Sequence, residues 1–341
     1  MVIVSYFVLQ SNAGGTAAER STPDAQTSTL RVMAEMSAPT KIRILRAAHL
    51  GMCFGVRDAI DLALNQTQPV TILGDLVHNE TVLQQLRSQG VHIQHQVANV
   101  TTPNVIITAH GASERTLAAI RGRGLQVLEA TCPLVHYAHR AVAGLVREGY
   151  HPIIIGKRDH VEVRGLTEDL LEYDVVLSEE DVAQLQERPR FGVAAQTTQP
   201  ITRVRRLVAL IEERFPASEV CFHDTVCQPT KQRQSAAIEL AQQSDVVIVI
   251  GGAQSNNTRE LVSTCRSFCP RVHHVQNASD LRSEWFEEAR TIGITAGTST
   301  PDSIIDEVED WLRKLEPPLC GETDQDFEPL GSGRAAALLS N

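Results

Sequence analysis

Three cysteines of this 341-residue chain share a sequence context that suits metal binding. Cys53, Cys132 and Cys227 each follow a strand-like run and precede a helical pattern, beside a small or turn-forming residue. A helix N-terminus favours the thiolate, which is the form of cysteine that binds metals. One such turn in each α/β unit indicates a threefold internal repeat, which would bring the three cysteines together around a common centre.

Three thiolates are one fewer than an ordinary four-cysteine iron–sulfur cluster uses. A 4Fe–4S cluster held by them would have one iron without a protein ligand, open to a substrate oxygen. Zinc is a second possibility, although structural zinc usually takes closely spaced cysteine pairs and the chain has no CxxC. Buried, inert thiols are a third, and spacing alone leaves all three open. Cys265 and Cys269 fit core packing, and no role is assigned to Cys221 or Cys320.

Polar residues that follow other predicted strands suit a phosphate or diphosphate. Imidazoles, hydroxyls, amides and the N–H groups of helix N-termini bind such anions. There is no Walker loop, and no GxGxxG follows a strand, so a nucleotide is not supported. The candidates are His78, His110, His160, Ser255, Asn257 and Ser299.

Glu162 is the candidate proton donor. It follows His160 by two residues, so both side chains would lie on one side of an extended segment. A diphosphate beside the carboxyl would raise its pKa by like charge and let it deliver a proton near neutral pH. Thr197 can pass this proton on or orient a substrate hydroxyl. Taken alone, Glu162 is better explained as a surface acid.

Strands and helices alternate from Lys41 onward, and this pattern predicts parallel sheets with function at the carboxyl ends of their strands. We expect a disordered extension over 1–40, α/β domains over 41–132, 133–223 and 224–315, and a loosely ordered tail over 316–341. Met33 or Met36 can be the biological start. The strongest predicted strands are 42–45, 70–73, 105–108, 127–130, 152–155, 192–195, 245–250 and 291–295, and the clearest helices are 56–65, 114–122, 135–148, 202–214, 230–242 and 302–314.

Composition excludes several classes of function. A net charge of −10 argues against a nucleic-acid partner, and aromatic residues, at 4%, are too few for base stacking. No apolar run reaches the ~20 residues of a membrane helix. Seven scattered cysteines favour a reducing compartment, and we expect the cytoplasm. Plastid import through the N-terminal extension is a disfavoured alternative.

Together these motifs resemble the 4-hydroxy-3-methylbut-2-enyl diphosphate reductase family, from about Ile42 to about Leu315. Each fragment is weak alone, but their order and spacing are specific. The chain departs from the family pattern in three places. The family commonly has serine, serine and asparagine at Ser255-Asn256-Asn257, proline at Val161, and smaller residues than Met52 and Phe54 around the first cysteine. The matching segments are 51–56, 77–79, 109–111, 130–134, 160–165, 196–198, Cys227, 255–257 and 295–302.

The resemblance implies three similar α/β domains in a pseudo-threefold trefoil around a central 4Fe–4S cluster, one per chain. Cys53, Cys132 and Cys227 would hold it and leave one iron open. Glu162 and Thr197 would deliver the proton. The diphosphate would be held by the six polar candidates, with Asn256 and Thr197 as further substrate contacts.

The implied reaction is the last step of the non-mevalonate isoprenoid pathway. It removes the hydroxyl of 4-hydroxy-3-methylbut-2-enyl diphosphate reductively and yields isopentenyl and dimethylallyl diphosphate. Electrons would come singly from a ferredoxin or flavodoxin, and the chain would be a monomer or weak homodimer. Two alternatives remain: a three-domain cluster enzyme similar to quinolinate synthase, which carries out no net reduction, and a non-catalytic zinc or redox-sensing protein.

Overall fold

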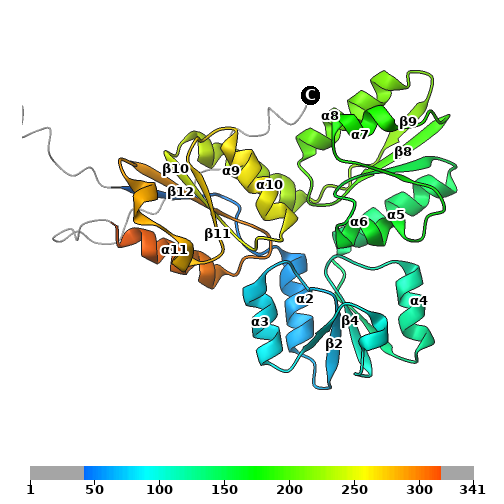
Figure 1. Ribbon diagram of the computed structural model, residues 1–341, viewed down its shortest axis with the longest axis horizontal. Coiled ribbons are helices and arrows are strands. Elements are labelled where there is room, and N and C mark those ends of the chain that lie inside the picture. Colours follow the sequence, from blue (N-terminus) through cyan, green and yellow to red (C-terminus); the bar gives the residue numbers. More distant parts are fainter. Residues whose placement is uncertain (1–41, 316–341) are drawn as a thin grey trace, which may run out of the picture. The chain divides into compact units, whose positions relative to one another are not determined.

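Twelve β-strands form the framework of the computed structural model, which describes residues 42–315. They make three four-stranded sheets, and all neighbouring strands are parallel. The α/β class with three similar sheets, predicted from the sequence, is confirmed (Figure 1). The predicted extension at 1–40 and tail at 316–341 lie outside the described residues.

The first two sheets have the same strand order, in which the first strand lies between the second and the third. The direction of winding therefore reverses between the first and third strands, and open α/β sheets bind ligands at the carboxyl ends of strands at such a reversal. The β2 sheet contains β3 (His92–Gln94), β2 (Val70–Leu73), β4 (Asn104–Ile107) and β5 (Gln126–Glu129). The β6 sheet contains β7 (Asp174–Val176), β6 (His151–Ile155), β8 (Arg190–Ala195) and β9 (Glu219–Phe222).

The third sheet repeats this order by using a strand from the beginning of the described chain. The predicted first domain, 41–132, includes that strand, but the strand pairs with β12 from Arg43–Thr291 to Arg46–Ile294. The apolar run identified a buried strand, but it carries no information about the neighbouring strand. The domain boundaries otherwise stay a prediction. The β10 sheet contains β11 (Val272–Val275), β10 (Val246–Ile250), β12 (Thr291–Ala296) and β1 (Arg43–Arg46).

Helices cover both faces of each sheet, so each sheet has two apolar cores. All five residues of β10 are apolar and buried, as expected for a strand covered on both sides. Cys265 and Cys269 are buried in one of these cores, as predicted. The helices are α2 (Phe54–Leu64), α3 (Glu80–Ser88), α4 (Glu114–Gly122), α5 (Pro133–Arg147), α6 (Val161–Thr167), α7 (Glu179–Gln184), α8 (Ile201–Arg214), α9 (Gln228–Gln242), α10 (Asn256–Arg266) and α11 (Asp302–Arg313).

Short elements are the ones that the sequence pattern missed. They are β3, β11, α6, α7 and the 3₁₀ turns η1 (Val97–Asn99), η2 (Ala278–Asp280) and η3 (Ser283–Phe286). Three to seven residues are too few for a helical or strand period to emerge. None of the described helices is long and apolar enough to span a membrane.

Candidate functional site

Each of the three predicted cysteine ligands occupies the N-cap position of a long helix, as the sequence indicated. Cys53 precedes α2, Cys132 precedes α5 and Cys227 precedes α9, and none of the three side chains caps its helix. Cys227 Sγ instead donates to Thr230 Oγ1 at 3.1 Å. The sulfurs therefore lie at the positive ends of helix dipoles but make no hydrogen bond to the helix N-termini.

The cysteines also mark the junctions between the sheets. Each one follows the fourth strand of a sheet, and its helix packs in the apolar core of the next sheet. The amide of each cysteine donates to a carbonyl just beyond the third strand of the sheet that the chain is leaving, at 3.0 to 3.2 Å. The pairs are Cys132–Ala109, Cys227–Thr197 and Cys53–Thr298. This repeated geometry supports the threefold repeat and fixes every cysteine beside a predicted site residue.

The surroundings of the cysteines are tight and partly apolar. A methyl group at Gly55 would lie 2.4 Å from Cys132 Sγ, so only glycine allows the first turn of α2 to approach this sulfur. Burial raises the pKa of Cys132, and it raises the pKa of Cys227 to about 11, with Cys53 adding to both shifts. These thiols therefore need a cation or a metal to become thiolates at neutral pH.

The six polar candidates follow the two central strands of the three sheets, at the winding reversals. His78, His160 and Ser255 follow the first strands, and His110 and Ser299 follow third strands. Thr197 follows the third strand of the β6 sheet. One pocket is lined by His78, His110, His160, Ser255, Asn256, Asn257 and Ser299, together with Thr198, Thr298, Val56 and Val77.

The three imidazoles pack against one another. The rings of His78 and His110 stack with 4.4 Å between their centroids, and His160 meets both edge-on at 5.2 and 5.5 Å. One ligating atom from each ring lies within 4.8 Å of the other two. The arrangement suits an anion held by N–H donors, and it also suits a metal ion.

Burial keeps these imidazoles neutral. It lowers the pKa of His78, lowers that of His110 well below its usual value and lowers that of His160 to about 3. Neighbouring histidines add to the shifts of His110 and His160. The positive charges of Lys157 and Arg259 lower the pKa of His78 and His160 further, whereas Asp75 opposes the shift of His78. A bound anion would oppose each of these downward shifts.

Two buried polar atoms of the pocket residues have no hydrogen-bond partner in the described structure, His110 Nδ1 and Asn257 Nδ2. Buried polar groups usually find partners, because leaving one unpaired costs its hydration. Ser299 Oγ makes only a long bond, 3.5 Å, to His78 O. The pocket thus keeps spare hydrogen-bonding capacity, which is expected of a ligand site.

Glu162 lies outside this pocket and is paired with Thr197, as the sequence suggested. Thr197 N–H donates to Oε1 at 2.6 Å, and Thr197 Oγ1 donates to Oε2 at 3.1 Å. The expected extended segment is wrong, because Glu162 lies in the first turn of α6. His160 Nδ1 accepts from Glu162 N–H at 3.2 Å and caps this helix. The capping bond joins the backbone of Glu162, the predicted proton donor, to a histidine of the pocket.

The Glu162 carboxyl is 1% exposed, and burial raises its pKa to about 7, against the opposing effect of the Thr197 bonds. From the sequence, such a shift was expected from a neighbouring diphosphate. Burial alone produces it here, so the carboxyl keeps a proton near neutral pH without a bound anion.

We expect this shift to appear in the pH dependence of stability. Between the ordinary pKa of 4.5 and about 7, the folded chain keeps a proton that the unfolded chain has lost. The free energy of unfolding contributed by Glu162 therefore falls as the pH rises through this window, by about 3 kcal/mol.

The buried histidines act in the opposite direction, because their lowered pKa values cost stability as the pH falls below 6.5. The measurement is therefore the difference in unfolding free energy between the wild type and Glu162→Gln, from urea denaturation of metal-free protein at pH 5 and pH 8. A difference that does not change with pH would contradict the raised pKa.

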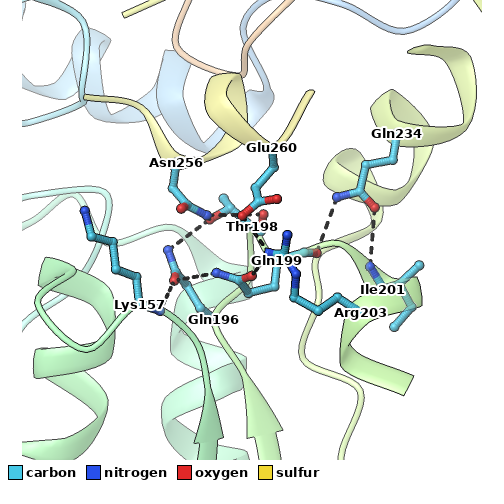
Figure 2. A network of polar contacts seen from close by, with 9 residues as sticks. All are labelled: Lys157, Gln196, Thr198, Gln199, Ile201, Arg203, Gln234, Asn256 and Glu260. Atoms are coloured by element: carbon cyan, nitrogen blue, oxygen red, sulfur yellow. Dashed lines mark hydrogen bonds and ion pairs between the residues drawn. The ribbon is translucent and has the colours of Figure 1, made fainter. Parts of the chain in front are cut away.

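Asn256, where the family commonly has serine, connects two sheets. Its Nδ2 donates to Thr198 Oγ1 at 3.1 Å, from the first residue of α10 to the segment after β8. Figure 2 shows this contact within a network that continues through Gln196 and Gln199. The Arg203–Glu260 ion pair, 2.7 Å, joins α8 to the same helix, α10. Asn256 therefore lines the pocket and also positions Thr198, beside Thr197.

Sequence reasoning missed several residues of this region. Thr198 lines the pocket, and Gln196 donates a hydrogen bond to Thr198. Both residues lie within segment 196–198, which matches the family, but neither was named as a site residue. Arg233 on α9 is buried and binds the Cys53 turn. The polar run that begins α9 gave no sign that one of its faces is buried. A period of 3.6 cannot be seen where buried and exposed positions are both polar.

The fold and the site define a class: an α/β protein with three like parallel sheets, a cysteine at each junction between them and a histidine-rich polar pocket at their strand ends. A family model described as "LytB protein" matches residues 44–313, and the chain belongs to this family.

Relatives of known name support this assignment. The 4-hydroxy-3-methylbut-2-enyl diphosphate reductase of Trichlorobacter lovleyi is 37% identical over 278 residues, which are 80% of this chain and 99% of the relative. The enzyme of that name from Aquifex aeolicus is 36% identical over 282 residues, 80% of this chain and 97% of the relative.

Two solved structures are also similar. The E-1-hydroxy-2-methyl-but-2-enyl-4-diphosphate reductase of Plasmodium falciparum matches with a TM-score of 0.76 and 26% identity, over 85% of this chain and 96% of that one. An (E)-4-hydroxy-3-methyl-but-2-enyl diphosphate reductase, described as the terminal enzyme of the non-mevalonate pathway, matches with a TM-score of 0.59 and 35% identity. The match covers 80% of this chain and 99% of that structure's chain.

Proposed function

We propose that this protein is an oxidoreductase that converts 4-hydroxy-3-methylbut-2-enyl diphosphate to isopentenyl and dimethylallyl diphosphate, the last step of the non-mevalonate pathway. The observation that carries the proposal is the pocket of three neutral imidazoles, two serines and two asparagines, joined through His160 to a buried carboxyl of pKa about 7. Curated relatives of this name, matched over nearly their whole length, support it.

Membership of the LytB family implies an iron–sulfur cluster, and the cysteines fit one. Cys53, Cys132 and Cys227 recur at equivalent junctions with sulfurs that cap no helix. The three cysteines come from three different junctions between sheets, whereas structural zinc usually takes closely spaced cysteine pairs. They would hold a 4Fe–4S cluster. When bound, it would supply single electrons and one iron without a protein ligand.

The pocket residues would hold the diphosphate. Neutral imidazoles, the hydroxyls of Ser255 and Ser299, and the Asn257 amide all provide hydrogen-bond donors. The unpaired His110 and Asn257 atoms would gain partners. The nearby charges of Lys157 and Arg259 favour an anion here, since they act on the same histidines. Two of the cysteine turns adjoin the pocket. The amides of Cys132 and Cys53 donate to the carbonyls of Ala109 and Thr298, and the next residues in the chain, His110 and Ser299, line the pocket.

Glu162 and Thr197 would supply the proton. Replacement of the hydroxyl by hydrogen consumes two electrons and two protons and releases one water. Glu162 is protonated in about half of the molecules near pH 7, and Thr197 Oγ1 is bonded to it, so the hydroxyl can relay a proton or orient the substrate hydroxyl. The ferredoxin or flavodoxin donor, the cytoplasmic location and the monomeric or weakly dimeric state stay predictions.

Anaerobic purification followed by an assay tests the function. We expect a brown protein with about four irons per chain that oxidises reduced viologen dye when the hydroxymethylbutenyl diphosphate is added. Both five-carbon diphosphates should appear as products. A colourless protein that contains zinc would favour a metal ion at the histidines and would contradict the proposal. A brown protein that is inactive towards this substrate would point to another cluster enzyme.

A further inference from the structure

Arg233 is a buried arginine that connects two of the three cysteine turns. It lies on α9, whose N-cap is Cys227, and its residue is 6% exposed. Nε donates to Gly51 O at 3.1 Å, and Nη2 donates to the same carbonyl. Gly51 lies two residues before Cys53 and has a φ of +74°, a conformation that favours glycine. The third bond, from Nη1, goes to Pro229 O within α9.

The charge of this guanidinium has no carboxylate partner in the described structure. No ion pair of Arg233 occurs among residues 42–315, and its three hydrogen bonds go to neutral carbonyls. A buried charge without an opposite charge is strongly disfavoured. Burial lowers the pKa of Arg233, and the negative charges that oppose this shift belong to Cys53 and Cys227. Arg233 binds the Cys53 turn and lies on the helix that begins at Cys227, so this uncompensated charge adjoins the site assigned to the metal centre.

The position of Arg233 in its helix is occupied by alanine in the other two repeats. The residue six positions after the cysteine is Ala59 in α2 and Ala138 in α5, and both alanines are fully buried. Only α9 has a charged side chain at this position. A small apolar residue therefore satisfies the helix packing twice, and the third repeat places a positive charge there instead.

We propose that Arg233 is a positioning residue for the metal centre, which ties the Cys53 turn to the Cys227 helix and raises the reduction potential of the bound cluster by its buried charge. The proposal rests on the cluster assigned to the three cysteines under the proposed function. A cluster bound by three thiolates is anionic, and each electron that it accepts adds a negative charge. A fixed cation at close range in a dry environment therefore stabilises the reduced form more than the oxidised form.

The test is the reduction potential of the cluster, measured by anaerobic titration monitored by spin resonance, in the absence of substrate. We expect Arg233→Met to lower the equilibrium constant for one-electron reduction about tenfold, which equals a shift of about −59 mV. Arg233→Lys keeps the charge but loses the two-pronged contact with Gly51 O, so its equilibrium constant should fall by less. The matched control is Arg57→Met, an arginine on α2 that is half exposed and paired with Asp302. Solvent should limit its effect to less than twofold.

A full iron content with an unchanged potential in Arg233→Met would overturn the proposal. If Arg233→Met binds no iron, the Arg233→Lys variant becomes the test. Iron binding by Arg233→Lys with a near-wild-type potential would support the role of the charge. Loss of iron from a folded Arg233→Lys protein would contradict it. The result is separable from the proposed function. A wild type with a cluster but no activity towards the diphosphate would refute the function and leave this test valid, whereas a wild type without iron would refute both.

Discussion

Replacing Glu162 by glutamine is expected to leave the iron content unchanged and to lower turnover about 10³-fold. The amide has the same shape and can still accept the Thr197 N–H, so the pocket should persist. It cannot release a proton, however, and the buried carboxyl with a pKa of about 7 is the group suited to that step. The measurement is anaerobic turnover with reduced dye, beside an iron analysis of the same sample.

The pH profile makes this test more specific. Wild-type turnover should decline above about pH 7 as Glu162 loses its proton, whereas the residual rate of the glutamine variant should lack this decline. Glu168→Gln is the matched control, since Glu168 is an exposed carboxyl at the end of the same helix and should not affect the rate. Wild-type-like turnover in Glu162→Gln would remove the proposed proton donor.

Replacing Cys132 by serine is expected to reduce both iron content and turnover, the latter to background. A serine hydroxyl is not ionised at neutral pH and is a poor ligand for iron in a sulfur cluster, so two cysteines would remain to hold it. The serine is close in size to cysteine and should tolerate the contact with Gly55. Iron and acid-labile sulfide per chain are the measurements.

Cys221→Ser provides the control for this experiment, because Cys221 lies in β9, away from the helix N-caps, and no role is assigned to it. It should keep the iron and the activity of the wild type. A Cys132→Ser protein with a full complement of iron would contradict the role of Cys132 as a ligand, even if its activity were lost.

Much of the framework could be predicted from the sequence, because its strands are apolar throughout and its helices are long. The run at 246–250 is apolar without interruption, and the pattern at 302–313 shows the helical period clearly. The positions of Cys53 and Cys132 could be predicted for the same reason, since each lies between a clear strand and a clear helix. Cys227 could be predicted because its turn resembles the other two. The order of strands within a sheet could not, because hydrogen bonding between β1 and β12 leaves no trace in either strand's pattern.

The candidate site could be predicted where chemistry is carried by residue type and could not where it depends on burial. The histidines, serines and Glu162 were identified by their place after strands, and the structure brings the histidines and serines to one pocket. The helical conformation of Glu162 was missed because His160 caps α6 with its imidazole, which is not among the preferred N-cap residues. Arg233 was missed because nothing in a polar helix distinguishes a buried arginine from a solvated one.

The pairing of β1 with β12 also sets an order of events while the chain is being made. The Cys53 turn leaves the ribosome early, but the carbonyls that bind Ala47, Gly51 and Cys53 belong to Ile294, Ala296 and Thr298. At about 5–20 residues per second they follow roughly 12 to 50 seconds later. Both other sheets can be complete by then. Cys53 therefore becomes anchored last, and a nascent chain interrupted before β12 would have two cysteine turns in place and the third still unfixed.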